Sequence, residues 1–93
     1  MKRNKKQKRR TSNCIFPGYR WCGPGCSGPG APLNAVDACC KMHDRCLGQG
    51  VPTCRCDSEF MNCLRSRRHK FSDEGKTAAI IYQIMKLKTL FTC

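Results

Sequence analysis

The sequence lacks a long apolar run, so none of its segments is expected to span a bilayer, which takes about 20 consecutive apolar residues. It also has few acidic residues: six Asp and Glu stand against eighteen Lys and Arg, which gives a net charge of +12. With 93 residues the chain has room for one domain with a modest core, which argues against a multidomain protein. A core of that size often needs covalent or metal support.

Cysteine supplies this support, because the chain contains ten of them. An even number at this density is typical of a disulfide scaffold formed in an oxidising compartment. The apolar run that a secretory signal needs is not seen before Cys14. We therefore expect an extracellular or other oxidising location although no signal peptide is visible, and the export route stays open.

The positive charge is concentrated at the N-terminus, where residues 1–10 hold seven of the eighteen Lys and Arg. Residues 1–13 are predicted to form a basic, disordered tail, followed by one domain over residues 14–93. Such a tail would be attracted to an anionic surface, either a membrane or nucleic acid.

Three helices are predicted downstream of residues 14–34, a loop rich in proline and glycine. The first covers residues 35–47 and the second residues 54–65. The third follows Ser72, a possible N-cap with two acidic residues after it. A stripe expected to face the core recurs along this third helix at steps of four, three and four, namely Ile80, Ile84, Leu87 and Phe91.

Four cysteines predict how the first two helices pack. Cys39 and Cys46 lie two turns apart on one helix face, and Cys56 and Cys63 repeat that spacing on the second helix. In antiparallel helices, facing residues have a constant index sum, which the pairs Cys39–Cys63 and Cys46–Cys56 satisfy. We therefore expect an antiparallel two-helix hairpin held by two disulfides, with His43 between them.

The most reactive cluster is His43 followed by Asp44. An imidazole can take a proton from water near neutral pH, and a carboxylate oxygen is a natural calcium ligand. Asp57 offers a second carboxylate, and the backbone of the glycine-rich run at residues 21–30 can fold tightly around an ion. Together these residues predict a calcium-assisted hydrolase with water as the nucleophile.

Three motifs occur in order, reading Trp21-Cys22-Gly23-x-Gly25, Asp37-x-Cys39-Cys40-x-x-His43-Asp44 and Cys54-x-Cys56-Asp57. They resemble the secreted phospholipase A2 family. The stretches Phe16-Pro17-Gly18-Tyr19-Arg20 and Asn62-Cys63-Leu64 are most similar to its venom (group III) branch. The resemblance implies a mainly α, disulfide-rich fold, with an N-terminal glycine-rich calcium loop, the helical hairpin and a third C-terminal helix.

The resemblance also implies a role for each residue of the cluster. His43 would be the general base on the water that attacks the sn-2 ester of a phospholipid, and Asp57 would hold the other imidazole nitrogen. The N–H of Gly23 would help to stabilise the oxyanion. The calcium ligands would be one carboxylate and three backbone carbonyls, those of Asp44 and of Trp21, Gly23 and Gly25.

The resemblance further implies the disulfides Cys22–Cys40 and Cys54–Cys93, and Cys14–Cys26 follows by elimination. The implied partner is a phospholipid membrane surface, expected to be anionic. Nucleic acid is not expected as a partner, and the oligomeric state is left open.

Several alternatives stay open. Glu59 competes with Asp57 as the partner of His43, because it borders the same cysteine face. Tyr82 either donates a hydrogen bond to Asp57 or is an ordinary packing residue, and Asp37 is predicted to stabilise the first helical turn. A second functional hypothesis is a non-catalytic cationic protein that binds or disrupts anionic membranes. The third, a zinc-bearing nucleic-acid binder, is disfavoured because Cys-Cys and Cys-x-Cys pairs are unlike the usual zinc spacing.

Overall fold

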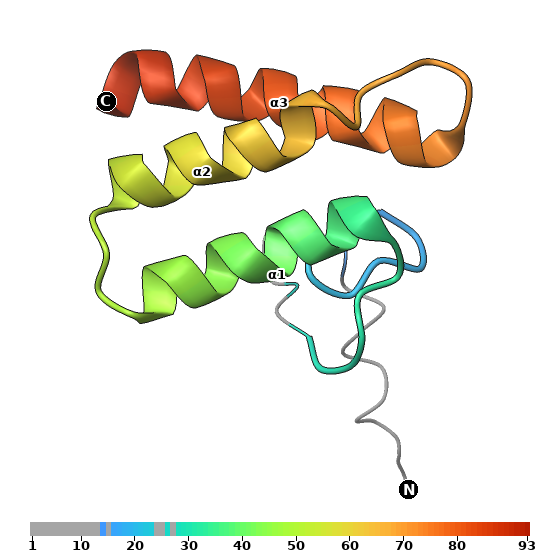
Figure 1. Ribbon diagram of the computed structural model, residues 1–93, viewed down its shortest axis with the longest axis horizontal. Helices are drawn as coiled ribbons and strands as arrows, with labels where there is room; N and C mark the ends of the chain where they lie inside the picture. The colour runs from blue at the N-terminus through green and yellow to red at the C-terminus, as the bar shows by residue number, and fades with distance from the viewer. Residues whose placement is uncertain (1–13, 15, 24–25, 27) are drawn as a thin grey trace, which may run out of the picture.

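The protein folds as three helices, as the sequence predicts: α1 (Ala35–Gly48), α2 (Thr53–Arg65) and α3 (Asp73–Thr92) (Figure 1). This computed structural model describes residues 14, 16–23, 26 and 28–93, so the predicted tail over residues 1–13 lies outside the described part. The described residues include no strand, and none of their helices is long and apolar enough to cross a membrane. The mainly α prediction is therefore confirmed.

Two of the helices begin at a side-chain cap. Oδ1 of Asn34 accepts a hydrogen bond from the backbone N–H of Asp37 at 2.9 Å, at the start of α1. Ser72 Oγ accepts one from Gly75 N at 3.2 Å, which confirms the cap predicted for α3. Between α1 and α2 the chain reverses over residues 49–52, where Gly50 has φ +79°, a conformation that glycine adopts without strain.

The disulfides tie these helices together as predicted. Cys39–Cys63 and Cys46–Cys56 join α1 to α2 and fix the antiparallel register of the hairpin. No free cysteine remains among the ten, all of which lie in the described residues. The other three pairs are Cys22–Cys40, Cys54–Cys93 and Cys14–Cys26.

The core lies along α2, which packs against both of the other helices (Figure 1). Val36 of α1, Leu64 of α2 and Ala78 of α3 are fully buried in it. In contrast, α1 and α3 meet over fewer residues, so their facing sides are not fully closed against each other. The cleft described below lies between these facing sides of α1 and α3.

The prediction for the buried face of α3 is wrong. Ile80, Ile84, Leu87 and Phe91 are 50, 57, 59 and 82 % exposed. The helix buries a second set of residues at similar helical spacing instead, namely Ala78, Ile81, Tyr82 and Met85. Both sets have the period of a helix, and the sequence pattern does not say which of them meets α2.

Candidate active site

His43 and Asp57 meet across the hairpin formed by α1 and α2. The imidazole Nε2 of His43 lies 2.7 Å from Oδ1 of Asp57. The side chain of Asp57 is 1 % exposed and that of His43 is 16 % exposed. Because an ionised carboxylate can only accept hydrogen bonds, Nε2 must carry the hydrogen, which leaves Nδ1 with a free lone pair.

Lys88 of α3 binds the second oxygen of Asp57 through its Nζ. Burial alone would raise the pKa of Asp57, but the hydrogen bonds and charges of Lys88 and His43 together outweigh it and hold this pKa below its ordinary value of 3.8. Asp57 is therefore ionised at neutral pH, although it is buried.

Tyr82, considered above as a partner of Asp57, contacts other residues. The guanidinium of Arg68 lies over its ring, 4.1 Å from the centroid. A hydrogen bond from Arg65 lowers the pKa of the Tyr82 hydroxyl below its usual range, and burial opposes this less strongly. The tyrosine thus interacts with the basic residues that follow α2, and Lys88 occupies the position beside Asp57.

Asp44 follows His43 on α1 and presents an oxygen without a partner. Oδ2 of Asp44 is buried and accepts no hydrogen bond from the described residues. Burial raises the pKa of Asp44 above its ordinary value of 3.8, while the charge of His43 lowers it less strongly and that of Asp37 adds to the rise. Such an oxygen is costly to bury without a partner, and it is suited to binding a cation.

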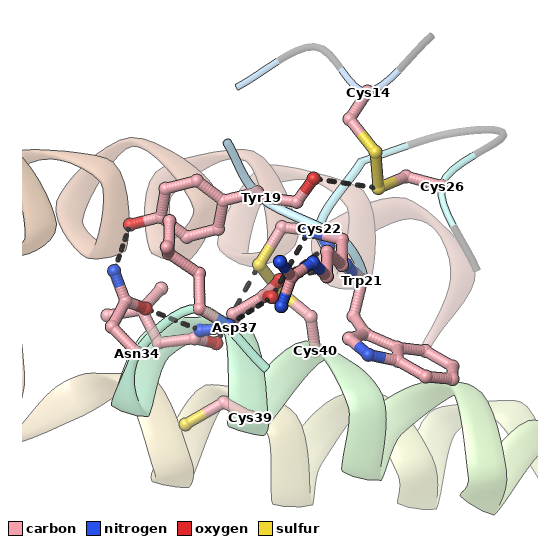
Figure 2. Close-up of a disulfide and its surroundings, with 12 residues drawn as sticks. Cys14, Tyr19, Trp21, Cys22, Cys26, Asn34, Asp37, Cys39 and Cys40 are labelled. Carbon is pink, nitrogen blue, oxygen red and sulfur yellow. Dashed lines mark hydrogen bonds between the residues drawn. A yellow bond between two sulfur atoms is a disulfide. The ribbon is translucent and has the colours of Figure 1, made fainter. Parts of the chain in front are cut away.

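Asp37 of α1 organises the loop that precedes the helix (Figure 2). Its side chain is fully buried. Its two oxygens accept four backbone hydrogen bonds of 2.8 to 3.1 Å, from the N–H groups of Arg20, Trp21, Cys22 and Leu33. Asp37 does lie in the first turn of α1, as predicted, but its carboxylate holds two loop segments against the helix rather than capping the turn alone.

The predicted calcium loop is described in part. Gly25 lies outside the described residues, whereas Trp21 and Gly23 line the same cleft as Asp44. Gly23 has φ +107°, which a residue with a side chain rarely adopts. Its carbonyl accepts a hydrogen bond from Cys26 N at 3.1 Å, and a carbonyl oxygen has a second lone pair.

The residues present fit a calcium ion. The described part of the chain has no group of three His, Cys, Asp or Glu that could hold a metal, so a cation here would depend on backbone carbonyls beside one carboxylate. Calcium accepts such a set of oxygen ligands. The unpartnered oxygen of Asp44, in the cleft that Trp21 and Gly23 line, is the observation that supports this fit.

His43 and Asp44 open into a cleft of about 490 Å³. Helix α3 supplies one wall, and α2 and the glycine-rich loop supply others. Apart from Gly23, the rest of the lining is apolar and comprises Phe16, Trp21, Cys40, Phe60, Ile80, Ile81, Ile84 and Met85. This cleft can take an apolar chain and expose it to one imidazole and one carboxylate.

Glu59, the alternative partner of His43, lies elsewhere. It lines a separate depression of about 630 Å³ that contains none of the predicted site residues. There its Oε2 lies 3.4 Å from Nε of Arg55, as an exposed pair one turn apart on α2. Of the two carboxylates on α2, the structure brings Asp57 and not Glu59 to His43.

Lys88 is a residue of the site that the sequence pattern did not identify. The Cys54–Cys93 disulfide carried a usable signal, because it joins the start of α2 to the end of α3. In antiparallel helices this bond places the last turns of α3 opposite the first turns of α2, where Asp57 lies. A lysine in those last turns was therefore a candidate for contact with Asp57.

These features define a class of protein: a small disulfide-linked helical protein with a His–Asp pair in an apolar cleft. Curated proteins similar to it carry the name phospholipase A2. The chain is 38 % identical over 72 residues to "Phospholipase A2" of Xylocopa aruana, covering 56 % of this chain and 40 % of that protein. It is 34 % identical over 77 residues to "Group 3 secretory phospholipase A2" of Bos taurus, covering 61 % and 15 %.

A plant protein is similar as well, namely "Probable phospholipase A2 homolog 1" of Oryza sativa subsp. japonica, at 39 % identity over 59 residues, or 57 % of this chain and 43 % of that protein. These matches confirm the predicted resemblance to the secreted phospholipase A2 family, including its venom and group 3 forms. The matched segments span less than half of the length of these relatives. No family model matches the chain, and no solved structure matches it.

Proposed function

We propose that this protein is an enzyme that hydrolyses the sn-2 ester of phospholipids, with calcium as cofactor, releasing a fatty acid and a lysophospholipid. The observation that carries the proposal is the hydrogen bond between His43 and Asp57 at an apolar cleft, beside the unpartnered oxygen of Asp44. A phospholipid is complementary to this cleft, because its apolar acyl chains suit the apolar lining and its polar ester and phosphate suit the end that holds His43 and Asp44.

In the proposed mechanism, His43 acts as general base. Its Nε2–H is donated to Asp57, so Nδ1 is the nitrogen that can take a proton from a water molecule as that water attacks the ester carbonyl. The ionised Asp57 then stabilises the imidazolium. The same Nδ1 returns the proton to the departing glycerol oxygen, which balances the reaction. The backbone N–H of Gly23 is proposed as a donor to the oxyanion.

The proposed calcium ligands are the carboxylate of Asp44 and the backbone carbonyls of Trp21, Gly23 and Gly25. When bound, the ion would supply positive charge that polarises the ester carbonyl and stabilises the oxyanion. A single carboxylate among neutral carbonyls makes a weakly charged site. We therefore expect a dissociation constant on the order of 10⁻⁴–10⁻³ M, as in extracellular calcium modules.

The proposed partner is an anionic membrane surface, and α3 supports this choice. Its exposed apolar stripe, Ile80, Ile84, Leu87 and Phe91, adjoins the cleft, because Ile80 and Ile84 also line it. Ile80 in addition borders a depression of about 640 Å³ whose polar lining includes Arg68, His69, Lys70 and Lys76. An apolar stripe beside basic side chains matches the acyl chains and phosphates of an anionic lipid surface.

An extracellular or other oxidising location is part of the proposal. The five disulfides support it, because bonds of this kind persist where thiols are not kept reduced.

A non-catalytic protein that binds or disrupts anionic membranes is the second candidate, and the net charge of +12 and the exposed stripe on α3 favour it as well. One experiment separates the two candidates. Fatty acid release from anionic phosphatidylglycerol vesicles is measured with calcium and then with excess EGTA, for the wild-type protein and for His43→Gln. We expect calcium-dependent release by the wild type alone. Vesicle binding without release by either protein would replace the enzyme with the membrane binder.

A further inference from the structure

We propose that Lys88 is a positioning residue for the catalytic pair, whose ammonium holds the Asp57 carboxylate in the orientation that accepts the Nε2–H of His43. This inference rests on the proposed hydrolysis and adds a third residue, from a third helix, to its site. It assigns to a lysine of α3 the contact that was considered above for Tyr82.

The burial of Asp57 makes this contact necessary. Its side chain is 1 % exposed, so its oxygens depend on partners within the protein. Oδ1 is occupied by His43 and Oδ2 by Lys88, which leaves neither oxygen without a donor. A carboxylate held on one side only can turn about its last side-chain bond, where the rotamer preference is broad. The lysine removes that freedom.

The packing of α3 on α2 keeps Lys88 in place. The Cys54–Cys93 disulfide joins the two helices close to this contact. On the same stretch of α3, the hydroxyl of Thr89 lies 3.9 Å from the sulfur of Met61 on α2. The register of the helices is thus fixed on either side of Asp57. Lys88 itself is 41 % exposed, so its ammonium reaches the buried carboxylate from the edge of the interface.

Tyr82, the other residue considered as a partner of Asp57, interacts with other groups. The hydroxyl of Tyr82 interacts with Arg65, and Arg68 covers its ring. The charge of Lys88 has a further effect, because it opposes protonation of the buried Asp57. An ionised Asp57 can only accept, which keeps the hydrogen of His43 on Nε2 and leaves Nδ1 free.

Lys88→Met tests the proposal, because methionine keeps much of the apolar stem and removes the ammonium. Lys86→Met is the matched control, since Lys86 lies on the same helix and is exposed. On a dispersed short-chain phospholipid with saturating calcium, we expect Lys88→Met to lower kcat by about 10-fold or more, similar to the loss of a residue that orients a metal ligand. KM should stay nearly unchanged. Lys88→Arg should recover part of kcat, and Lys86→Met should behave as the wild type.

A second readout does not depend on turnover. In the wild type, the ring proton on Nε2 of His43 should give a slowly exchanging, low-field NMR signal, because it is hydrogen-bonded to a buried carboxylate. Lys88→Met should weaken or abolish this signal, whereas Lys86→Met should keep it. Should Lys88→Met fail to form its five disulfides, Lys88→Leu, which also has no donor, takes its place with the same expected losses.

An unchanged kcat and an unchanged ring-proton signal in Lys88→Met would overturn the positioning role. Failure of the proposed function has a different signature. If His43→Gln hydrolysed phospholipid as fast as the wild type, the enzyme mechanism would be wrong. The ring-proton comparison of wild type and Lys88→Met would still decide whether the lysine orients the pair.

Discussion

The imidazole of His43 lies flat against the ring of Phe60, with the ring centroids 4.4 Å apart and the planes inclined by 14°. Phe60 follows Asp57 by one turn of α2 and is buried. The same helix therefore supplies both the hydrogen-bond acceptor of the imidazole and a surface on which its face rests. A ring restrained in both ways is held in one orientation, as the proposed role of general base requires.

His43→Gln should leave the fold intact and remove hydrolysis. The amide cannot take a proton from water, so acyl release should fall at least about 10²-fold, the lower end of general-base contributions. Mass mapping of the non-reduced variant should find the same five disulfides as in the wild type. A variant that retained its rate would contradict the role of His43 as base.

Asp44→Asn should raise the melting temperature of the calcium-free protein and remove the response of that temperature to calcium. The buried, unpartnered carboxylate has a raised pKa, which means that its charge costs folding free energy at neutral pH. Removing the charge should therefore raise the melting temperature of the calcium-free protein. It should also abolish the increase in melting temperature that we expect calcium to produce in the wild type. Glu59→Gln is the control, because it removes a carboxylate from the separate depression of about 630 Å³. A calcium response retained by Asp44→Asn would reject Asp44 as a ligand.

Leu87→Glu should weaken membrane binding more than Gln83→Glu does. Both positions are exposed on α3 and both changes add one negative charge, but only Leu87 belongs to the apolar stripe. If the leucine side chain is buried in the lipid, losing that burial should cost about 1.5–3 kcal/mol of binding free energy, or roughly 10- to 100-fold in affinity. Cosedimentation with phosphatidylglycerol vesicles measures the difference. Equal weakening by the two variants would mean that charge alone attracts the protein to the membrane.

The stability contributed by Asp57 should depend on pH in a predictable direction. Because its folded pKa lies below the ordinary value of 3.8, the contribution is complete above about pH 4 and is lost as the pH falls through the folded pKa. Lys88→Met removes the strongest of the interactions that lower this pKa. The difference in unfolding free energy between wild type and Lys88→Met should therefore be constant from about pH 7 to 5 and shrink below about pH 4. Denaturant titrations at several pH values measure this difference. A difference in unfolding free energy that grew as the pH fell would contradict the predicted pH dependence.

Asp37→Asn should destabilise the loop that carries the proposed calcium ligands. An amide nitrogen cannot accept the backbone hydrogen bonds that one of the carboxylate oxygens now receives. The cost should be at least about 1.5 kcal/mol, the lower range for hydrogen bonds to a charged group. Asp73→Asn, at an exposed first-turn position of α3, is the control. Equal unfolding free energies of the two variants would argue against the organising role of Asp37.

The features that could be predicted from the sequence are those specified by covalent or local geometry. The spacing of Cys39, Cys46, Cys56 and Cys63 was sufficient for the hairpin, because disulfides tolerate only a narrow range of separations. The Ser72 cap was readable because capping is local. The buried face of α3 was not, since two apolar stripes of equal period compete along that helix. Lys88 needed the packing of α3 on α2, which no local pattern encodes.

The two disulfides between α1 and α2 close two rings, one nested inside the other. The exposed turn at residues 49–50 lies within both rings. A protease that cut the chain there would open both rings and still leave the two helices joined at two points. His43 and Asp57 lie between those points, so a nicked molecule would keep the proposed catalytic pair together. In surroundings rich in proteases, the two disulfides, and not an uncut backbone, would keep His43 next to Asp57.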